Sequence, residues 1–207
     1  MNHKKLAALA LALLCAVPMM TACGKGSKER PTISEENMPY GSTMREDKNS
    51  FAVPMTYDRR FLEQEELAKA ADLFAAIQSN DAALYEKTTF PFYLKYQQEQ
   101  VYKLDSPDAL VKHLHSMFAA KAADDYQCSM VVITGISTNA EAGTLNSVVH
   151  MLDACYDGDG AFLDSVQKSL DMTVELHLSY NGGSQTAIVE DQHVFAFQTA
   201  DGWFALV

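Results

Sequence analysis

The chain has 207 residues, of which 48% are hydrophobic, and its formal net charge at neutral pH is −11. With the ends set aside, this length supplies one ordinary hydrophobic core but hardly two, so we expect a single folded domain. From Phe61 onward there are 7 lysines, no arginine and 21 acidic residues, which gives a net charge of −14. Because nucleic-acid phosphates and anionic headgroups repel such a domain, we expect no nucleic-acid partner.

Residues 1–22 have the pattern of a bacterial export signal. A basic start is followed by the apolar run Leu6 to Val17, which is too short to cross a bilayer as a helix, since that needs about 20 residues. The next residues, Met20-Thr21-Ala22-Cys23, resemble the lipobox of bacterial lipoproteins. The resemblance implies cleavage before Cys23, a diacylglyceryl group on Cys23, and an extracytoplasmic protein whose membrane partner is reached through that lipid. An ordinary secretory peptide cut near Ala22 and an uncleaved anchor are the alternatives.

Residues 23–57 are predicted to form the lipidated end and a flexible tether. They contain three prolines, scattered polar residues and no sustained apolar period. Such a composition cannot bury enough surface to offset the entropy of the chain. A local alternation of apolar residues at positions 51–57 leaves open a strand packed on the domain.

The first half of the domain, residues 58–207, carries signals for helices. Asp58 is a candidate N-cap for a first helix through Ile77, and Asp81 can cap a short second one. Ser106-Pro107-Asp108 starts a later helix, because a cap residue, a proline and an acid follow one another. The aromatic, proline-interrupted run 89–94 is predicted as an edge strand or a loop. The predicted buried face of the later helix consists of Leu110, Val111, Leu114, Met117 and Phe118.

The second half of the domain carries signals for strands. Apolar or alternating runs predict strands at 129–137, 172–180, 185–198 and 203–207. Residues 138–171 are predicted to be a mostly helical insertion. Helices followed by hairpin-linked strands predict an α+β fold, with N-terminal helices packed on one face of a curved antiparallel sheet and a helical insertion before the last strands.

This order of elements is similar to that of the nuclear-transport-factor-2-like (cystatin-like) superfamily. The resemblance rests on the end of the first helix, Gln78-Ser79-Asn80-Asp81-Ala82-Ala83-Leu84-Tyr85, on the Ser-Pro-Asp helix, and on the closing hairpin at Asp201-Gly202-Trp203-Phe204. It covers residues 58–207 and implies a cone formed by the sheet and the helices. The insertion before Met172 departs from the pattern.

An acidic, glycine-rich segment resembles part of a calcium loop. Its candidate ligands are Asp153, Asp157, Asp159 and Asp164, the last at the twelfth position of the loop. The third position is Cys155, a sulfur where calcium requires an oxygen. The sequence therefore favours an acidic turn between two helices, and we expect neither a resident metal nor another cofactor.

Two further groups of residues could carry chemistry. Asp191 and His193 alternate with Phe195 along one strand, so they are the best candidates for an acid/base pair inside the cone, unless a bulge near Glu190 reverses the faces. Cys128 and Cys155 either form one disulfide or remain buried thiols.

These observations lead to three hypotheses of function. The first is a non-catalytic module, tethered outside the cell membrane, that binds a small ligand or an envelope protein. The second is a small-molecule isomerase or dehydratase that uses the cone. The third is a structural or regulatory envelope lipoprotein.

Overall fold

A computed structural model describes residues 34–141 and 143–207 of the chain. Cys23 and the lipobox lie outside the described residues. The chain divides into two compact units, Met1–Asn37 and Met38–Val207. In the first unit the structure describes only the end, which contains the 3-10 helix η1 (Glu35–Asn37). Within the described ranges, no helix has the length and apolar character that a membrane crossing requires.

The second unit is an α+β domain, as predicted. Its strands are β1 (Met44–Asp47), β2 (Met55–Asp58), β3 (Gln127–Ser137), β4 (Lys168–Tyr180), β5 (Gln185–Thr199) and β6 (Gly202–Leu206). Its helices are α1 (Gln64–Ser79), α2 (Ala82–Thr88), α3 (Pro91–Tyr96), the π-helix η2 (Gln97–Val101), α4 (Pro107–Ala119), α5 (Gly143–Tyr156) and α6 (Ala161–Ser165).

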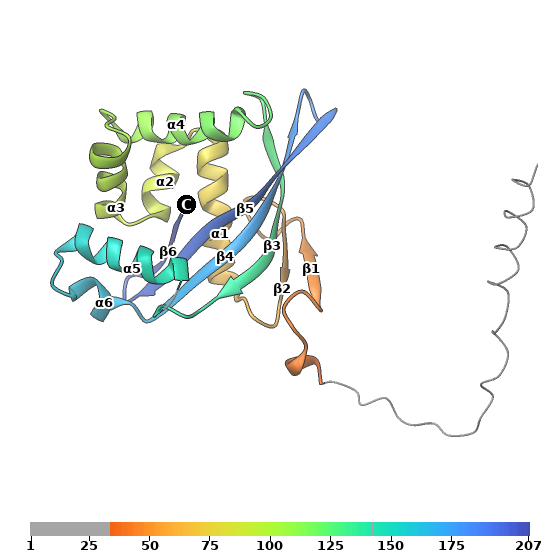
Figure 1. The fold of residues 1–207 in the computed structure, drawn as a ribbon. Coiled ribbons are helices and arrows are strands. Elements are labelled where there is room, and N and C mark those ends of the chain that lie inside the picture. The colour runs from red at the N-terminus through yellow and green to blue at the C-terminus, as the bar shows by residue number, and fades with distance from the viewer. Residues whose placement is uncertain (1–33, 142) are drawn as a thin grey trace, which may run out of the picture. The chain divides into compact units, whose positions relative to one another are not determined.

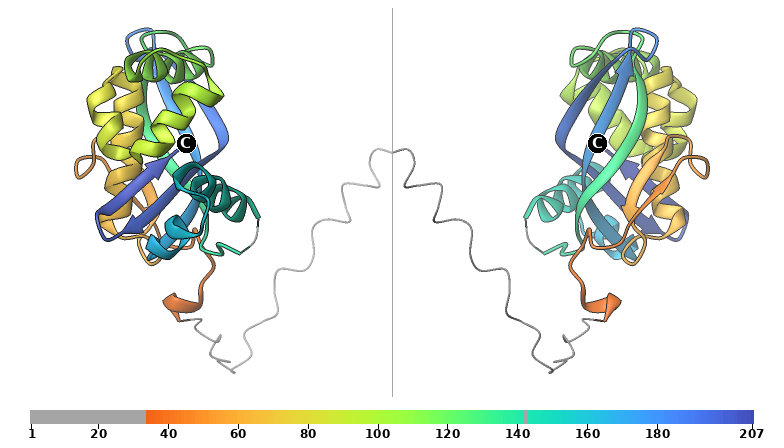
Figure 2. Two further views of the ribbon diagram at one scale, coloured as in Figure 1. Left: turned by 90° about the vertical axis from the view of Figure 1, so that its left-hand side faces the viewer. Right: turned by 90° about the vertical axis from the view of Figure 1, so that its right-hand side faces the viewer.

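The described strands form one six-stranded sheet in the order β1-β2-β3-β4-β5-β6 (Figure 1). Neighbouring strands are antiparallel except β2 and β3, which run parallel with Met55 beside Val131. The sheet is therefore mixed, and the expectation of a purely antiparallel sheet was wrong. The reason is that β2 precedes the first helices, and a parallel connection needs such a long crossover. The central strands β3, β4 and β5 are long, bent and twisted (Figure 2).

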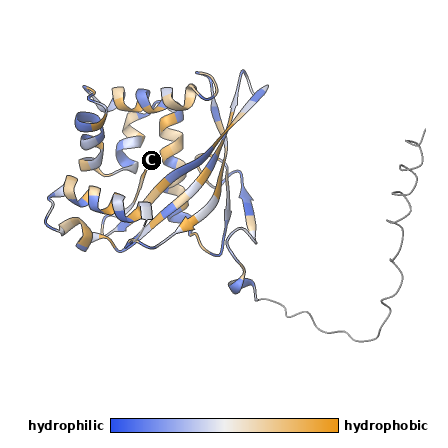
Figure 3. Cartoon of the chain, viewed as in Figure 1, coloured by the Kyte–Doolittle hydropathy of each residue, from blue (hydrophilic) through white to orange (hydrophobic). Residues whose placement is uncertain are grey.

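Helices cover both faces of the sheet, which corrects the expectation of helices on one face. Alternate residues of β4 and β5, such as Met172 and Val194, belong to the main core with α1 and α4. The intervening residues Phe195 and Phe197 belong to a second cluster with α5 and α6. Figure 3 shows hydrophobic residues along the central strands and α1. The predicted helical insertion thus consists of α5 and α6 and has its own apolar cluster.

The N-terminal boundary of the domain lies at Met38 rather than at residue 58. Residues 38–57, which composition predicted as tether, contribute β1 and most of β2, and Met55 is fully buried. The alternation of apolar residues at 51–57 was the signal for this strand. Two further expectations were wrong: Glu63 rather than Asp58 is the N-cap of α1, and Pro91 begins a helix. Proline at the first helical position sacrifices no helical hydrogen bond.

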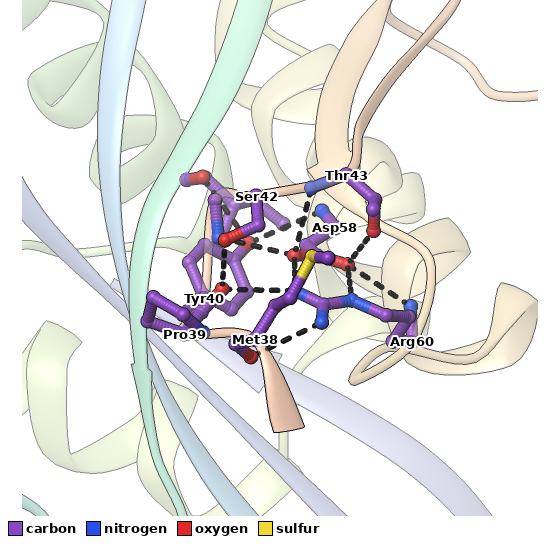
Figure 4. Close-up of polar contacts among 9 residues, drawn as sticks. Met38, Pro39, Tyr40, Ser42, Thr43, Asp58 and Arg60 are labelled. Carbon is purple, nitrogen blue, oxygen red and sulfur yellow. Dashed lines mark hydrogen bonds and ion pairs between the residues drawn. The ribbon is translucent and has the colours of Figure 1, made fainter. Parts of the chain in front are cut away.

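Asp58 has a different role, because it fastens the start of the domain. It is a fully buried carboxylate that forms a two-pronged ion pair with Arg60, whose Nε donates to Oδ1 over 2.9 Å (Figure 4). Thr43 Oγ1 and the Gly41 N–H also donate to it, at 2.8 and 3.0 Å. The guanidinium of Arg60 donates further to the carbonyls of Met38 and Pro39. These bonds hold residues 38–43 on the sheet.

Candidate functional site

A groove of about 440 Å³ opens between the C-terminal half of α4 and strand β5. We call it the edge groove. Six apolar residues line it: Leu114, Met117, Phe118, Ile188, Val189 and Val207. The polar residues that line it are Tyr102, Lys121, Glu190 and Gln192. An apolar cleft of this size with a few polar groups is typical of sites that bind a small ligand or a short segment of chain.

The wall that α4 provides follows from the sequence of that helix. Ser106 caps it, accepting a hydrogen bond from the Ala109 N–H at 3.2 Å, and Pro107 is its first residue. Its apolar stripe was predicted to be buried throughout. Leu110, Val111 and Leu114 are buried, but Met117 is 50% exposed. The stripe therefore continues past the part that the domain covers and leaves an apolar side chain on the groove.

The opposite wall is β5, where Ile188 is 56% exposed. A bulge interrupts β5 here, since Val174 pairs with Gln192 but Leu176 pairs with Val189. Glu190 and Asp191 thus lie opposite the single residue Glu175, and Asp191 has a φ of 52°. The Gln192 side-chain amide donates to the Glu190 carbonyl at 2.9 Å. The groove is therefore bordered by a strand that is irregular at its rim.

The bulge changes the predicted acid/base pair. Asp191 is exposed on the bulge, and His193 binds Asp171 of β4 instead, with 2.7 Å between His193 Nδ1 and Asp171 Oδ1. Neither Asp191 nor His193 lines the edge groove. The His193 ring stacks on Phe195, which belongs to the second cluster, so the dyad lies on the sheet face that α5 and α6 cover. The structure therefore does not bring the predicted pair together in a common cavity.

The acidic segment is a capped turn between α5 and α6. Asp153 Oδ2 accepts from the Gly160 N–H at 3.2 Å, and Asp159 Oδ1 accepts from the Ala161 N–H at 3.0 Å. Asp157 and Asp164 are exposed. In the part of the chain that the structure describes, no three acidic, histidine or cysteine side chains gather closely enough to hold a metal ion. Two of the four carboxylates of the calcium-loop candidate thus accept hydrogen bonds from backbone amides, as in an acidic turn between two helices.

Cys128 and Cys155 are both free thiols, so the disulfide is not formed. Cys128 is buried in the main core on β3, and burial raises the pKa of its thiol to about 12. Cys155 lies on α5, which packs in the second cluster, and burial also raises its pKa. Cys128 thus lies on a strand of the main core, and Cys155 lies on a helix of the second cluster. The sequence alone did not show that the two cysteines belong to different clusters.

Sequence reasoning did not foresee the edge groove, and it also missed the residue that binds His193. Ile188 and Val189 were assigned only to a strand, and the signal that could have marked them is the length of β5 beside the short β6. Asp171 was assigned to the helical insertion, but it belongs to β4. Its contact with His193 follows from the register between β4 and β5, which the sequence does not show. Comparison of the chain with protein-family models, with curated proteins and with solved structures gave no match.

Proposed function

We propose that this protein is a lipid-anchored, extracytoplasmic and non-catalytic binding module, and that its binding site is the edge groove. The anchor would be Cys23, with residues 24–37 as the connection to the domain. The lipobox-like sequence supports this placement. Two acyl chains on one cysteine satisfy the rule that stable anchoring takes more than a single chain. We further propose that the domain is a variant of the nuclear-transport-factor-2-like fold, which its twisted sheet and N-terminal helices support.

The observation that carries the binding function is the exposed apolar surface on the two walls of the groove. Met117 and Ile188 are about half exposed, although each belongs to a regular element with buried neighbours. Covering one such side chain contributes on the order of 1 kcal/mol. A bound apolar group that covers part of this surface removes it from water, which favours a binding site over a purely structural envelope protein.

A titration with indole, a small water-soluble apolar probe, tests this function. The full chain, carrying ¹³C-labelled methionine methyl groups, is placed in phosphatidylcholine nanodiscs and followed by NMR. We expect a saturable shift of the Met117 methyl signal and none of the Met44 signal. Met44 is a matched internal control, because it is 39% exposed on β1 and does not line the groove.

Two variants sharpen the titration. Ile188→Thr removes apolar surface from the groove and is expected to weaken indole binding about fivefold, from a loss of roughly 1 kcal/mol. Val101→Thr makes a comparable change at a residue that is 47% exposed outside the groove, and it should bind as the original chain does. Equal binding by both variants, or equal shifts of Met44 and Met117, would exclude the groove as the site.

One observation favours a second candidate function, acid/base chemistry at the Asp171–His193 dyad. A largely buried carboxylate holds His193 through Nδ1, which leaves Nε2 as the nitrogen that can exchange a proton with a substrate. Proton abstraction from 5-nitrobenzisoxazole, a general probe for such bases, tests it. Catalysis that His193→Gln abolishes and His150→Gln preserves would support an enzyme, and His150 is a suitable control because it is exposed on α5. Equal rates for both variants would exclude this candidate.

A further inference from the structure

We propose that the occupant of the edge groove is a short, cationic, extended peptide segment of a partner protein, which adds to β5 as a further strand. This inference rests on the proposed function, because it names the occupant of that same groove. Four features of the molecule support it: the pairing of β5, the direction of the backbone groups of β5, the position of the groove along this strand, and the charge of the domain.

β5 has a long unpaired edge. The strand spans Gln185–Thr199 and pairs with β4 almost along its whole length. On its other side β6 pairs only with Phe195–Thr199. Residues 185–194 of β5 therefore have no strand partner on that side among the described strands. The regular part of this edge, residues 185–189 before the bulge, is a template for another strand.

The hydrogen bonds of the neighbouring strands indicate which backbone groups lie on this edge. The His177 carbonyl of β4 accepts from Ser129 of β3, so His177 directs its backbone groups toward β3. Successive residues of a strand direct these groups to alternate edges, so Leu176 faces β5, where it pairs with Val189. The same alternation then directs the N–H and C=O of Ile188 away from β4, toward the unpaired edge.

The groove lies along this edge. Ile188 and Val189 both line it, although side chains of successive strand residues point to opposite faces of a sheet. A cavity lined by both residues therefore follows the rim of the strand. Its other end is at Val207, the residue after β6, so an occupant would continue the line of β6. At the usual strand and sheet spacings one residue fills about 160 Å³, so about 440 Å³ holds roughly three residues of an extended chain.

Two observations favour a single peptide segment over a second copy of this chain. The occupant has α4 on one side and β5 on the other, so it cannot bring a neighbouring strand of its own sheet into the groove. A second copy would also carry the same excess of acidic residues, so two copies of the domain repel each other.

The charge of the domain specifies the chemistry of the segment. Residues 38–207 contain 11 basic and 24 acidic residues, so a cationic segment is attracted and an anionic one is repelled. Main-chain hydrogen bonds would supply the affinity, and apolar side chains on both faces of the added strand would contact Ile188 on one face and Val189 on the other.

The probe is a fluorescein-labelled heptapeptide in which lysine and valine alternate, with a copy whose inner amides are N-methylated. Fluorescence anisotropy measures binding to the full chain in phosphatidylcholine nanodiscs. Ile188→Thr and Ile188→Pro both remove the isoleucine side chain, but only proline removes the edge-facing N–H. Proline at an edge position with its nitrogen toward solvent is compatible with a strand. We expect the Ile188→Pro variant to bind at least tenfold more weakly than Ile188→Thr, and the methylated peptide to bind at least tenfold more weakly than its parent.

The outcomes separate this inference from the function on which it rests. Equal binding of the parent and methylated peptides overturns strand addition, and this arm does not depend on the folding of any variant. If indole binds in the groove but the parent peptide does not, strand addition is wrong and the groove remains a binding site. If neither binds, both proposals fail. A dimer of the chain that Ile188→Pro dissociates would also overturn the proposal, because the occupant would then be a second copy.

Discussion

The ion pair between Asp58 and Arg60 gives a quantitative prediction about how the start of the domain is held. Arg60→Ala leaves the buried Asp58 carboxylate without its counter-ion, and breaking a buried pair in this way costs about 3–5 kcal/mol. Bonds from Thr43 and Gly41 remain, so we expect the lower end, about 3 kcal/mol. For a domain of this size that corresponds to a decrease in Tm of about 6–12 °C.

Urea unfolding, followed by circular dichroism, measures the loss. Arg45→Ala is the matched control, because Arg45 is 57% exposed and its oxygen–nitrogen distance to Asp47 is 3.8 Å. Exposed pairs of this kind contribute at most about 1 kcal/mol. If Arg60→Ala and Arg45→Ala change the free energy of unfolding by similar small amounts, the reasoning about the start of the domain is wrong.

The same pair predicts the pH dependence of stability. The hydrogen bond from the Arg60 side chain, assisted by Thr43 and Gly41, holds the pKa of Asp58 well below its ordinary value. Because the pKa of Asp58 is lower in the folded state, its carboxylate stabilises the folded protein at pH values above the unfolded-state pKa of about 3.9. This contribution is lost as the pH falls toward the folded-state pKa. Asp58→Asn should therefore be less stable at neutral pH and lose less stability than the original chain between about pH 4 and pH 2.

Three further predictions concern other parts of the chain. Burial raises the pKa of the Cys128 thiol to about 12, so iodoacetamide at pH 8 should alkylate Cys155 but not Cys128 in the folded protein. After unfolding both should react, and mass spectrometry measures the labelling. Equal labelling of the two cysteines in the folded protein would contradict the buried position of Cys128. Ser106→Ala removes the cap of α4 and should cost about 1 kcal/mol in urea unfolding, whereas no loss would mean that the cap bond contributes nothing. Cys23→Ala should stop the incorporation of labelled fatty acid in a bacterial host, and continued incorporation would refute the lipid anchor.

The sequence was most informative where one local rule decides the structure. Asp81 and Ser106 cap α2 and α4 as predicted, because a cap needs only its own turn of backbone. The first helix was also predicted, and its predicted last residue, Ile77, lies two residues before the end of α1 at Ser79. Asp58 was misassigned because it is the last residue of β2 and lies five residues before Glu63, the N-cap of α1, and a cap-type residue alone does not show where a helix begins.

The site depended on register and on strand length, which local patterns do not encode. A bulge at Glu190 was foreseen as a complication, and the structure contains it, so Asp191 faces solvent and Asp171 takes the place expected for it beside His193. Met117 fits the apolar stripe of α4 and is nevertheless exposed, because β5 and α4 do not close over it. The edge groove lies where β6, ten residues shorter than β5, leaves β5 unpaired, and its other wall is α4, which is distant from β5 in the sequence.

The central claim is that the edge groove binds an apolar segment, and competition between the two probes tests it most directly. Indole is bound to the full chain until the Met117 methyl signal is fully shifted, and the lysine–valine peptide is then added. We predict that the peptide reverses the shift of Met117 and leaves Met44 unchanged, and that the midpoint of this reversal rises with the concentration of indole, as competition for one site requires. Indole that stays bound while the peptide binds elsewhere, or a peptide that moves the Met44 signal equally, would contradict the account.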